Sequence, residues 1–350
     1  MTRTIDIAGR SIGAGLQPYV IAEMSGNHNG DIGRAIALID AAKAAGADAV
    51  KLQTYTADTI TLDHDGPEFR IEGGLWHGRR LYDLYDEAHT PWEWHPALFE
   101  HARRIGITCF SSPFDPTAVD LLERLGAPAY KIASFEIVDT PLIAYAARTG
   151  KPLIVSTGMA NRQDIADAVS TARSSGNGGI ALLHCVSGYP TPASEANLRR
   201  MQSLMENFEC AVGLSDHSMG TEVAVAAVAL GATVVEKHLT LARADGGPDS
   251  EFSLEPAEFA DLVRGTRNAF AALGAADYES PESERRSAIF RRSLYAVRDI
   301  AAGEVFTNEN VRSIRPGLGL PPRLLSSVIG RRATIDISRG TPMSLGLIAS

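Results

Sequence analysis

The sequence contains few cysteines, no excess of positive charge and no long apolar run, and each absence excludes a class of protein. Its three cysteines, Cys109, Cys185 and Cys210, lack the spacing of a metal or redox motif, and the first two lie in apolar, strand-like runs. We therefore expect buried free thiols in a reducing cytoplasm. The net charge of −9 argues against a nucleic-acid partner, although a small anionic substrate can still bind a locally basic site.

Membrane and secretion signals are also absent. No run of about 18 apolar residues occurs, so we expect no membrane span. The segment Met1–Arg10 lacks the basic, apolar and small-residue succession of a secretory signal. A chain of 350 residues, 45% of them hydrophobic, is long enough for one large domain and a small second one.

Short β-branched runs alternate with helical patterns along most of the chain. We expect strands at Tyr19–Glu23, Ala49–Gln53, Thr108–Ser111, Ala129–Ile132, Leu153–Ser156, Ile180–His184, Ala211–Ser215 and Thr233–His238. Eight such β-then-α units predict an α/β fold, a closed (β/α)8 TIM barrel. A doubly wound open sheet is the alternative, but no Gly-x-Gly-x-x-Gly motif follows the first strand.

Two segments depart from this alternation. The connection 54–90 is unusually long and rich in Gly, Trp, Tyr and charge; such a loop is usually functional, and the alternative is a surface excursion away from the site. The polar stretch 277–287 reads as a linker, which places the barrel at 1–276 and a small β-rich domain at 288–350. Within that domain, Asp299–Glu304 is echoed by Asp336–Thr341.

Polar residues gather where the expected strands end, which is where barrel enzymes carry their active sites. Lys51 and Gln53 are two residues apart and so share one face of their strand, as Glu236 and His238 do. The candidates at or just after strand ends are Glu23, Lys51, Gln53, Ser112, Lys131, Ser134, Glu136, Ser187, Tyr189, Ser215, His217, Glu236 and His238.

His217 and His238 close consecutive strands, so their imidazoles can share one metal ion; the alternative is two hydrogen-bonded core histidines. Lys51 and Lys131 suit a phosphate and a carboxylate, although each can instead belong to a structural ion pair. Glu23 can act in catalysis or merely pair with a lysine. His28 and His184 stay undecided, and we expect the other histidines, His64, His77, His89, His95 and His101, in loops or at the surface.

In their order along the chain, these segments resemble the sialic acid synthase family. The matching segments are Ala22–His28, Val50–Thr54, Phe110–Phe114, Tyr130–Glu136, Ser156–Met159, Leu183–Cys185, Tyr189–Thr191, Gly213–His217 and Glu236–His238. The tail, including Arg315-Pro316-Gly317, resembles the antifreeze-like (SAF) domain that ends such enzymes. Within the family, Gly73–Trp76, Leu81–Tyr85, Thr90–His95 and Asp249–Leu254 are similar to the pseudaminic acid synthase branch.

This resemblance implies a transferase that condenses phosphoenolpyruvate with an amino sugar and releases phosphate by C–O cleavage. The branch implies 2,4-diacetamido-2,4,6-trideoxy-L-altrose as the sugar; the alternative is a manno-configured sugar, as in legionaminic or N-acetylneuraminic acid synthases. A divalent metal is expected on His217 and His238, Mn²⁺ in the first place, with Mg²⁺ and Co²⁺ as alternatives.

The resemblance also assigns roles to the remaining residues. Glu23, Glu136 and Glu236 are the expected catalytic carboxylates. Arg315 is expected to reach the sugar in a partner subunit's active site, which implies a domain-swapped homodimer; the alternative is a surface arginine. The expected substrate-binding residues are Lys51, Gln53, Ser112, Lys131, Ser134, Ser187, Tyr189, Ser215, Asp249 and Arg315.

Two other functions remain open on the sequence alone. A metal-dependent barrel aldolase or epimerase could use the same histidine pair, but it would release no phosphate. A sugar- or ice-binding protein could use the small β-rich domain without turnover. A binding module has no need, however, of lysines, histidines and carboxylates together at the strand ends.

Overall fold

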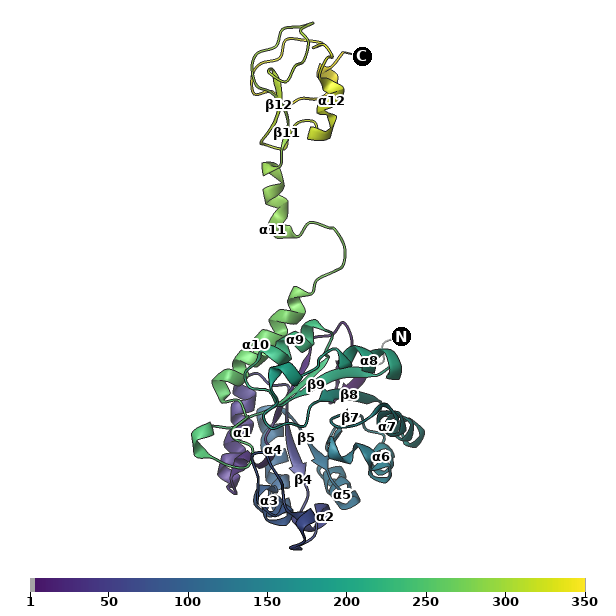
Figure 1. Cartoon of the computed structure of the whole chain (residues 1–350). Coiled ribbons are helices and arrows are strands. Elements are labelled where there is room, and N and C mark those ends of the chain that lie inside the picture. The colour runs from purple at the N-terminus through teal and green to yellow at the C-terminus, as the bar shows by residue number, and fades with distance from the viewer. Residues whose placement is uncertain (1–3, 350) are drawn as a thin grey trace. The chain divides into compact units, whose positions relative to one another are not determined.

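The computed structural model describes residues 4–349, and the chain divides into two compact units, Met1–Gly274 and Ala275–Ser350. The first unit is a closed barrel of eight parallel strands with helices around it, as predicted (Figure 1). Its strands are β3 (Tyr19–Glu23), β4 (Ala49–Thr54), β5 (Thr108–Pro113), β6 (Tyr130–Ile132), β7 (Leu153–Ser156), β8 (Ile180–Cys185), β9 (Ala211–Asp216) and β10 (Val234–His238). β10 pairs with both β9 and β3 and so closes the ring.

Local sequence signals set the helix ends. Asp31 and Asp115 cap α1 and α5 by accepting hydrogen bonds from backbone N–H groups of the first turn, and Pro116 follows the second cap. Gly126 ends α5 in a left-handed conformation, with φ 74°. The barrel unit's helices are α1 (Ile32–Ala44), α2 (Ala57–Ile60), α3 (Leu81–Ala88), α4 (His95–Ile105), α5 (Pro116–Leu125), α6 (Thr140–Ala147), α7 (Arg162–Ser175), α8 (Arg200–Phe208), α9 (Glu222–Ala229) and α10 (Pro256–Ala272). None of the helices within 4–349 combines the length and apolarity needed to cross a membrane.

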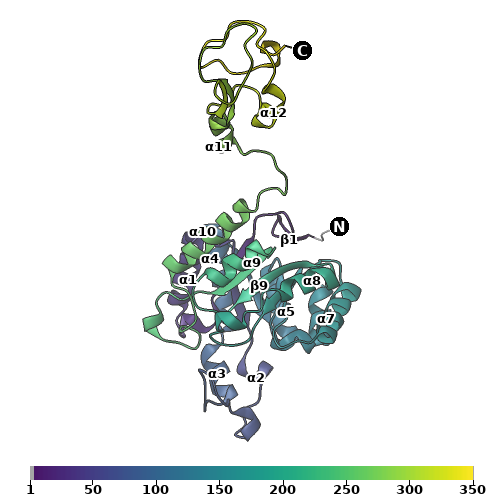
Figure 2. The ribbon, with the colours of Figure 1, turned by 45° about the horizontal axis from the view of Figure 1, so that its top comes forward.

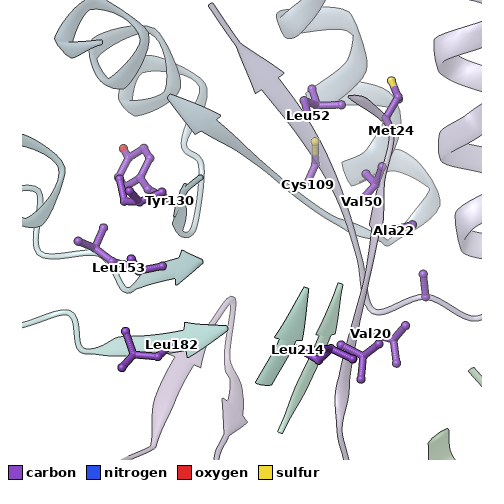
Figure 3. Packing of buried hydrophobic residues seen from close by; sticks show 14 of the residues in the cluster. Val20, Ala22, Met24, Val50, Leu52, Cys109, Tyr130, Leu153, Leu182 and Leu214 are labelled. Atoms are coloured by element: carbon purple, nitrogen blue, oxygen red, sulfur yellow. The ribbon is translucent and has the colours of Figure 1, made fainter. Parts of the chain in front are cut away.

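Strand alternation divides the buried residues between two cores. Val20 and Ala22 face outward and pack in the large layer between strands and helices, where Leu182 and Leu214 also lie (Figure 3). Tyr19 and Ile21 belong to the inner core of the barrel. Glu23, two residues beyond Ile21, therefore continues the inward face at the C-terminal end of the barrel.

A hairpin that the sequence analysis did not predict contributes to the inner core. β1 (Ile5–Ile7) pairs antiparallel with β2 (Arg10–Ile12). Their isoleucines Ile5, Ile7 and Ile12 pack with the inner core residues of the barrel strands. These core residues include the first residues of barrel strands, such as Tyr19 and Ala49. The hairpin therefore covers the N-terminal end of the barrel, opposite the expected site.

The connection 54–90 is not structureless. It contains α2 and α3, which lie side by side in both ribbon views (Figures 1 and 2) and follow the end of β4 in Figure 1. Arg80 organises the turn before α3 through ion pairs with Asp63, Asp65 and Asp83. The segment is thus an ordered excursion from the barrel.

The second unit is small and β-rich, as predicted. β11 (Ser293–Ala296) pairs antiparallel with β12 (Val311–Ile314), and α12 (Leu325–Val328) packs beside them. The two echoed segments pair with each other through an antiparallel bridge between Ile300 and Ile337. The stretch 277–287 contains α11 (Glu282–Arg285) and the start of a short 3-10 turn, and the predicted domain boundaries stay predictions.

Candidate active site

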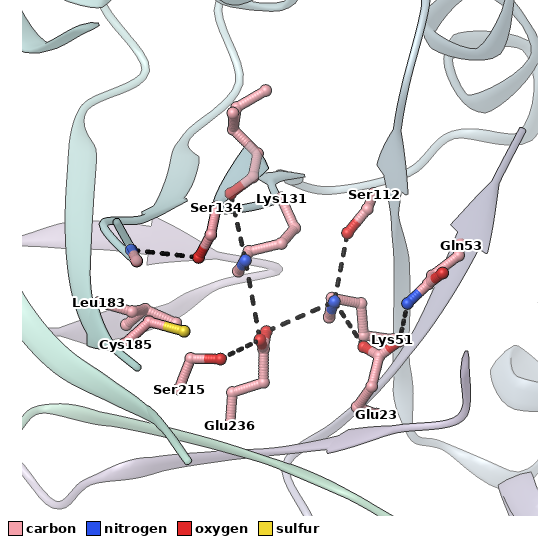
Figure 4. Close-up of polar contacts among 12 residues, drawn as sticks. Glu23, Lys51, Gln53, Ser112, Lys131, Ser134, Leu183, Cys185, Ser215 and Glu236 are labelled. Carbon is pink, nitrogen blue, oxygen red and sulfur yellow. Dashed lines mark hydrogen bonds and ion pairs between the residues drawn. The ribbon is translucent and has the colours of Figure 1, made fainter. Parts of the chain in front are cut away.

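Four buried ionisable side chains meet at the C-terminal end of the barrel. Glu23, Lys51, Lys131 and Glu236 come from β3, β4, β6 and β10, and none is more than 4% exposed. Lys51 Nζ lies 2.5 Å from Glu23 Oε2 and 3.7 Å from Glu236 Oε2, and Lys131 Nζ lies 3.7 Å from Glu236 Oε1 (Figure 4). Residues far apart in sequence thus form one network of two cations and two carboxyl groups.

Amide and hydroxyl groups surround this network. Gln53 Nε2 donates to Glu23 Oε1 at 3.1 Å, and Lys51 Nζ donates to Ser112 Oγ at 3.2 Å. Ser215 Oγ donates to Glu236 Oε1 at 3.0 Å, and Ser134 Oγ accepts from the Gly158 N–H at 3.1 Å (Figure 4). The arrangement suits a small, highly charged anion because lysines and hydroxyl donors converge on one place.

Burial and pairing give the two carboxyl groups different proton affinities. Burial raises the pKa of Glu23 to about 7; Lys51 opposes this shift and Glu236 reinforces it. Burial alone would also raise the pKa of Glu236, but Lys131 and Lys51 together hold it below its usual range. Glu236 is therefore the permanent anion of the network, whereas Glu23 can exchange a proton near neutral pH.

His217 and His238 lie side by side at the ends of β9 and β10, with ring centroids 5.4 Å apart. His217 Nδ1 is 2.9 Å from the carbonyl oxygen of Val186, which leaves Nε2 as the potential ligand atom. His238 Nδ1 is buried without a hydrogen-bond partner, and burial, followed by the nearby His217, lowers the pKa of this imidazole well below its usual value. A neutral imidazole with an unpaired nitrogen fits a metal ligand.

The protein would supply few ligands to such a metal. Across residues 4–349, no three or more His, Cys, Asp and Glu side chains gather in an arrangement that could hold an ion. Two imidazoles therefore leave several coordination positions for oxygen atoms from water or substrate.

A buried ion pair holds the segment that carries His217. Lys237, which is fully enclosed, donates to Asp216 Oδ2 and to the Ser218 carbonyl oxygen, both at 2.6 Å. Asp216 Oδ1 accepts from the backbone N–H and the hydroxyl of Ser218. Asp216 and Ser218, which flank His217 in the sequence, are therefore both bonded to Lys237, the residue before His238. The sequence analysis did not predict these contacts.

The outer part of the site is aromatic. The Tyr189 ring lies 4.4 Å from His217 and 5.2 Å from Phe252, which in turn lies 4.9 Å from His238. Asp249 is buried, and its carboxylate accepts from the Ser25 hydroxyl. The predicted residues Tyr189 and Asp249 thus lie beside the histidine pair and the Glu23 network, respectively.

Other predicted residues lie outside the hydrogen-bonded network. Glu136 has an unpaired buried Oε2 atom, and burial raises its pKa to about 7 against the opposing charge of Lys131. Ser187 Oγ lies 4.0 Å from the Cys185 sulfur, and the Ser187 side chain also hydrogen-bonds to Tyr189. Arg315 belongs to the second unit. Ser156, which ends β7 and belongs to a segment that carries the family resemblance, also has a buried hydroxyl without a hydrogen-bond partner.

One prediction about the histidines outside the His217–His238 pair was wrong. His95 was expected at the surface, but it is fully buried and its Nε2 lies 2.8 Å from Thr54 Oγ1. The α4 N-terminus carries it against the strand ends, and the apolar spacing of that helix gave no sign of this role. His28 and His184 are also fully buried, and His184 Nε2 contacts the Ala196 carbonyl oxygen at 2.7 Å. All three cysteines are buried, as expected, and Cys109 and Cys185 are free thiols.

A cavity of about 450 Å³ opens near the other end of the barrel, beside the starts of β7 and β8. Its lysine and arginine, Lys151 and Arg173, are engaged with Glu123 and with the Phe208 carbonyl oxygen. Barrel enzymes carry their chemistry at the C-terminal end of the strands, so we place the active site at the Glu23–Lys51–Lys131–Glu236 network.

Comparison with known proteins identifies the family of this fold and site. The NeuB family matches residues 38–278, and the SAF domain matches 291–347. The chain belongs to the NeuB family. A pseudaminic acid synthase of Campylobacter jejuni is 45% identical over 328 residues, 94% of this chain and 96% of the relative. An N,N'-diacetyllegionaminic acid synthase of Legionella pneumophila is 36% identical, covering 95% and 94%.

The solved structure of an N-acetylneuraminic acid synthetase of Leptospira borgpetersenii matches this NeuB chain with a TM-score of 0.73 and 34% identity, over 82% of this chain and 95% of that one. The resemblance to the sialic acid synthases, to their pseudaminic acid branch and to the SAF domain is therefore confirmed. The roles of individual site residues in this NeuB protein stay predictions.

Proposed function

We propose that this protein is a pseudaminic acid synthase, which condenses phosphoenolpyruvate with 2,4-diacetamido-2,4,6-trideoxy-L-altrose and releases phosphate. The observation that carries the proposal is the buried network of Lys51, Lys131, Glu23 and Glu236 beside the His217–His238 pair. A metal aldolase or epimerase needs no such pair of buried lysines, and a binding module needs neither the lysines nor the histidines.

Lys51 and Lys131 hold the phosphate and carboxylate of phosphoenolpyruvate. In the absence of this anion, Glu23 and Glu236 neutralise the lysines, which makes their burial tolerable. Hydroxyl donors complete the anion site because each can rotate its O–H toward a phosphate oxygen. These hydroxyls belong to Ser112, Ser134, Ser187 and Ser215.

The residues then support bond formation at two carbons. C3 of phosphoenolpyruvate forms the new C–C bond with the sugar aldehyde carbon while the aldehyde π bond breaks, its electron pair moves to the oxygen and that oxygen takes a proton from water. Positive charge develops at C2. The ionised Glu236 stabilises this charge. Water adds to C2, and Glu23 or Glu136 accepts one of its protons. The C2–O bond to phosphate then breaks, phosphate leaves with the electron pair, and the new C2 hydroxyl passes its proton to the departing phosphate as it becomes the ketone. Carboxyl groups whose pKa lies at about 7 suit this proton transfer.

His217 and His238 would hold a divalent metal, with Mn²⁺ preferred over Mg²⁺ because two imidazoles with oxygen as the remaining ligands suit Mn²⁺ better, and with Co²⁺ as an alternative. A metal at that place supplies Lewis-acid polarisation of the aldehyde oxygen. The unpaired Nδ1 of His238 and the fixed orientation of His217 support this assignment.

Gln53, Tyr189 and Asp249 bind the sugar, and Arg315 contributes to the sugar site of a partner subunit in a domain-swapped homodimer. Exposed apolar side chains support an interface: Leu318, three residues beyond Arg315, is 65% exposed, and Phe135 and Val138 beside β6 are 61% and 63% exposed. Such side chains gain stability when a second copy covers them. The substrates of this enzyme are small metabolites of the cytoplasm, and we propose no nucleic-acid or membrane partner.

A manno-specific synthase is the second candidate. It is favoured by the similarity to the Legionella N,N'-diacetyllegionaminic acid synthase over nearly the whole chain. The same lysine and histidine arrangement would serve both sugars, because the two differ only in stereochemistry.

The deciding experiment is phosphate release from phosphoenolpyruvate with Mn²⁺. The altrose derivative is compared with 2,4-diacetamido-2,4,6-trideoxymannose and N-acetylmannosamine. We expect release with the altrose sugar alone and its loss with EDTA. Release only with a manno sugar would replace the proposed branch by the second candidate, and no release from a folded, metal-loaded protein would overturn the synthase proposal.

A further inference from the structure

The long excursion 54–90 delivers one aromatic side chain to the outer edge of the site. The Trp76 ring lies 5.5 Å from the Tyr189 ring, and Tyr189 lies against His217. Trp76, Tyr189 and Phe252 thus form a continuous set of rings next to the histidine pair, which we call the aromatic wall. Tyr189 lies between β8 and α8, and Phe252 lies between β10 and α10, whereas Trp76 comes from the long excursion 54–90 after β4.

A second contact fixes Trp76 from another direction. Its indole N–H donates to the Pro248 carbonyl oxygen at 2.9 Å. Pro248 precedes Asp249, whose carboxylate is linked through the Ser25 hydroxyl and Gln53 to Glu23. One side chain therefore joins the segment of Tyr189 to that of Asp249, the two outer residues assigned to the sugar.

We infer that Trp76 determines sugar specificity, by giving the aromatic wall an apolar surface that favours sugars with a methyl group at C6 over sugars with a hydroxyl group there. The inference rests on the proposed function, because it takes the histidine pair as the place of the sugar aldehyde. The rest of the sugar chain then extends outward along the wall.

Physical chemistry supports this selectivity. The C6 methyl and the acetamido methyl of a 2,4,6-trideoxy sugar gain from contact with aromatic rings. A sugar hydroxyl facing the same rings loses its hydrogen bonds to water and finds no replacement. A group of this size in an apolar site changes kcat/KM by about 10- to 200-fold.

The test compares kcat/KM for three sugars in wild-type, Trp76→Ala and Trp76→Phe enzymes. Two sugars are 6-deoxy, the 2,4-diacetamido-2,4,6-trideoxy derivatives of altrose and mannose, and 2,4-diacetamido-2,4-dideoxymannose carries the C6 hydroxyl with the same C4 acetamido group. Where the sugar with the C6 hydroxyl gives no turnover, its inhibition constant replaces kcat/KM. We expect Trp76→Ala to reduce the preference for the better 6-deoxy sugar at least about 10-fold and to leave the KM of phosphoenolpyruvate unchanged.

The Phe variant separates the ring from the hydrogen bond. It keeps an aromatic face but cannot donate to Pro248, and we expect it to retain most of the preference. Trp92 is the matched control, since its indole also donates to a backbone carbonyl, that of Tyr55, at 3.1 Å. Trp92→Ala should leave the ratio between sugars unchanged.

An equal loss for all three sugars in Trp76→Ala, or an equal rise in the KM of phosphoenolpyruvate, would show a merely structural tryptophan and overturn the inference. The two proposals fail separately. The choice between altrose and mannose derivatives decides the proposed branch, whereas the choice between methyl and hydroxyl at C6 decides the role of Trp76.

Discussion

Replacing Asp216 with Asn tests whether the buried pair with Lys237 stabilises the barrel and fixes His217. Lys237 is fully enclosed, and its two partners are the Asp216 carboxylate and the Ser218 carbonyl oxygen. Asp216→Asn keeps the shape but leaves Lys237 without a counter-charge. Removing one member of a buried pair costs about 3–5 kcal/mol, and we expect that loss in the free energy of unfolding.

Urea unfolding followed by tryptophan fluorescence measures this loss in the full chain. The protein has three tryptophans, and all lie in the barrel unit, so the signal reports on the barrel. The exposed pair of Arg264 and Asp261 gives a matched control. Asp261→Asn should change the free energy of unfolding by less than about 1 kcal/mol.

A double variant, Asp216→Asn with Lys237→Met, completes the cycle. It removes both charges and keeps apolar volume, so we expect it to be more stable than the sum of the single losses predicts. A loss below about 1 kcal/mol in Asp216→Asn would mean that the pair contributes no more than a surface pair, and would refute the reasoning. Additive losses in the double variant would also refute it.

Three further predictions concern the chemistry and the subunit arrangement. His217→Ala and His238→Ala should each abolish Mn²⁺-dependent phosphate release and weaken Mn²⁺ binding measured by calorimetry; unchanged binding in both would remove the metal assignment. Glu136→Gln should raise the free energy of unfolding relative to wild type by about 1–3 kcal/mol at pH 8 but little at pH 5. The reason is that the folded protein raises the pKa of Glu136 to about 7, so the wild-type protein loses stability as the pH rises from the unfolded pKa of this carboxyl to its folded pKa. Parallel pH profiles of the two proteins in urea unfolding would contradict this. Arg315→Ala should raise the KM of the sugar far more than that of phosphoenolpyruvate, and equal rises in steady-state kinetics would exclude its role at the sugar.

The strands were predictable because each one carries its own signal. All eight predicted barrel strands are present with ends that differ by no more than two residues, for example Thr108–Ser111 against the observed Thr108–Pro113. Strand-end position also predicted the meeting of Lys51, Lys131 and Glu236, since parallel strands in a barrel bring their C-terminal ends together. The hairpin Ile5–Ile12 escaped prediction because two three-residue strands give too short a pattern.

The sequence by itself determined the barrel, the β-rich second unit and the inward-facing polar residues, because hydrophobic period and strand-end position are local properties of the chain. Only the tertiary structure decided which of these residues touch. Three contacts illustrate this: Asp216 pairs with Lys237, Trp76 reaches Tyr189 and Pro248, and His95 is buried against Thr54. Each depends on how the helices and loops pack around the barrel. Such contacts join residues separated by up to 226 positions, as between Asn27 and Ser253, and no local periodicity specifies them.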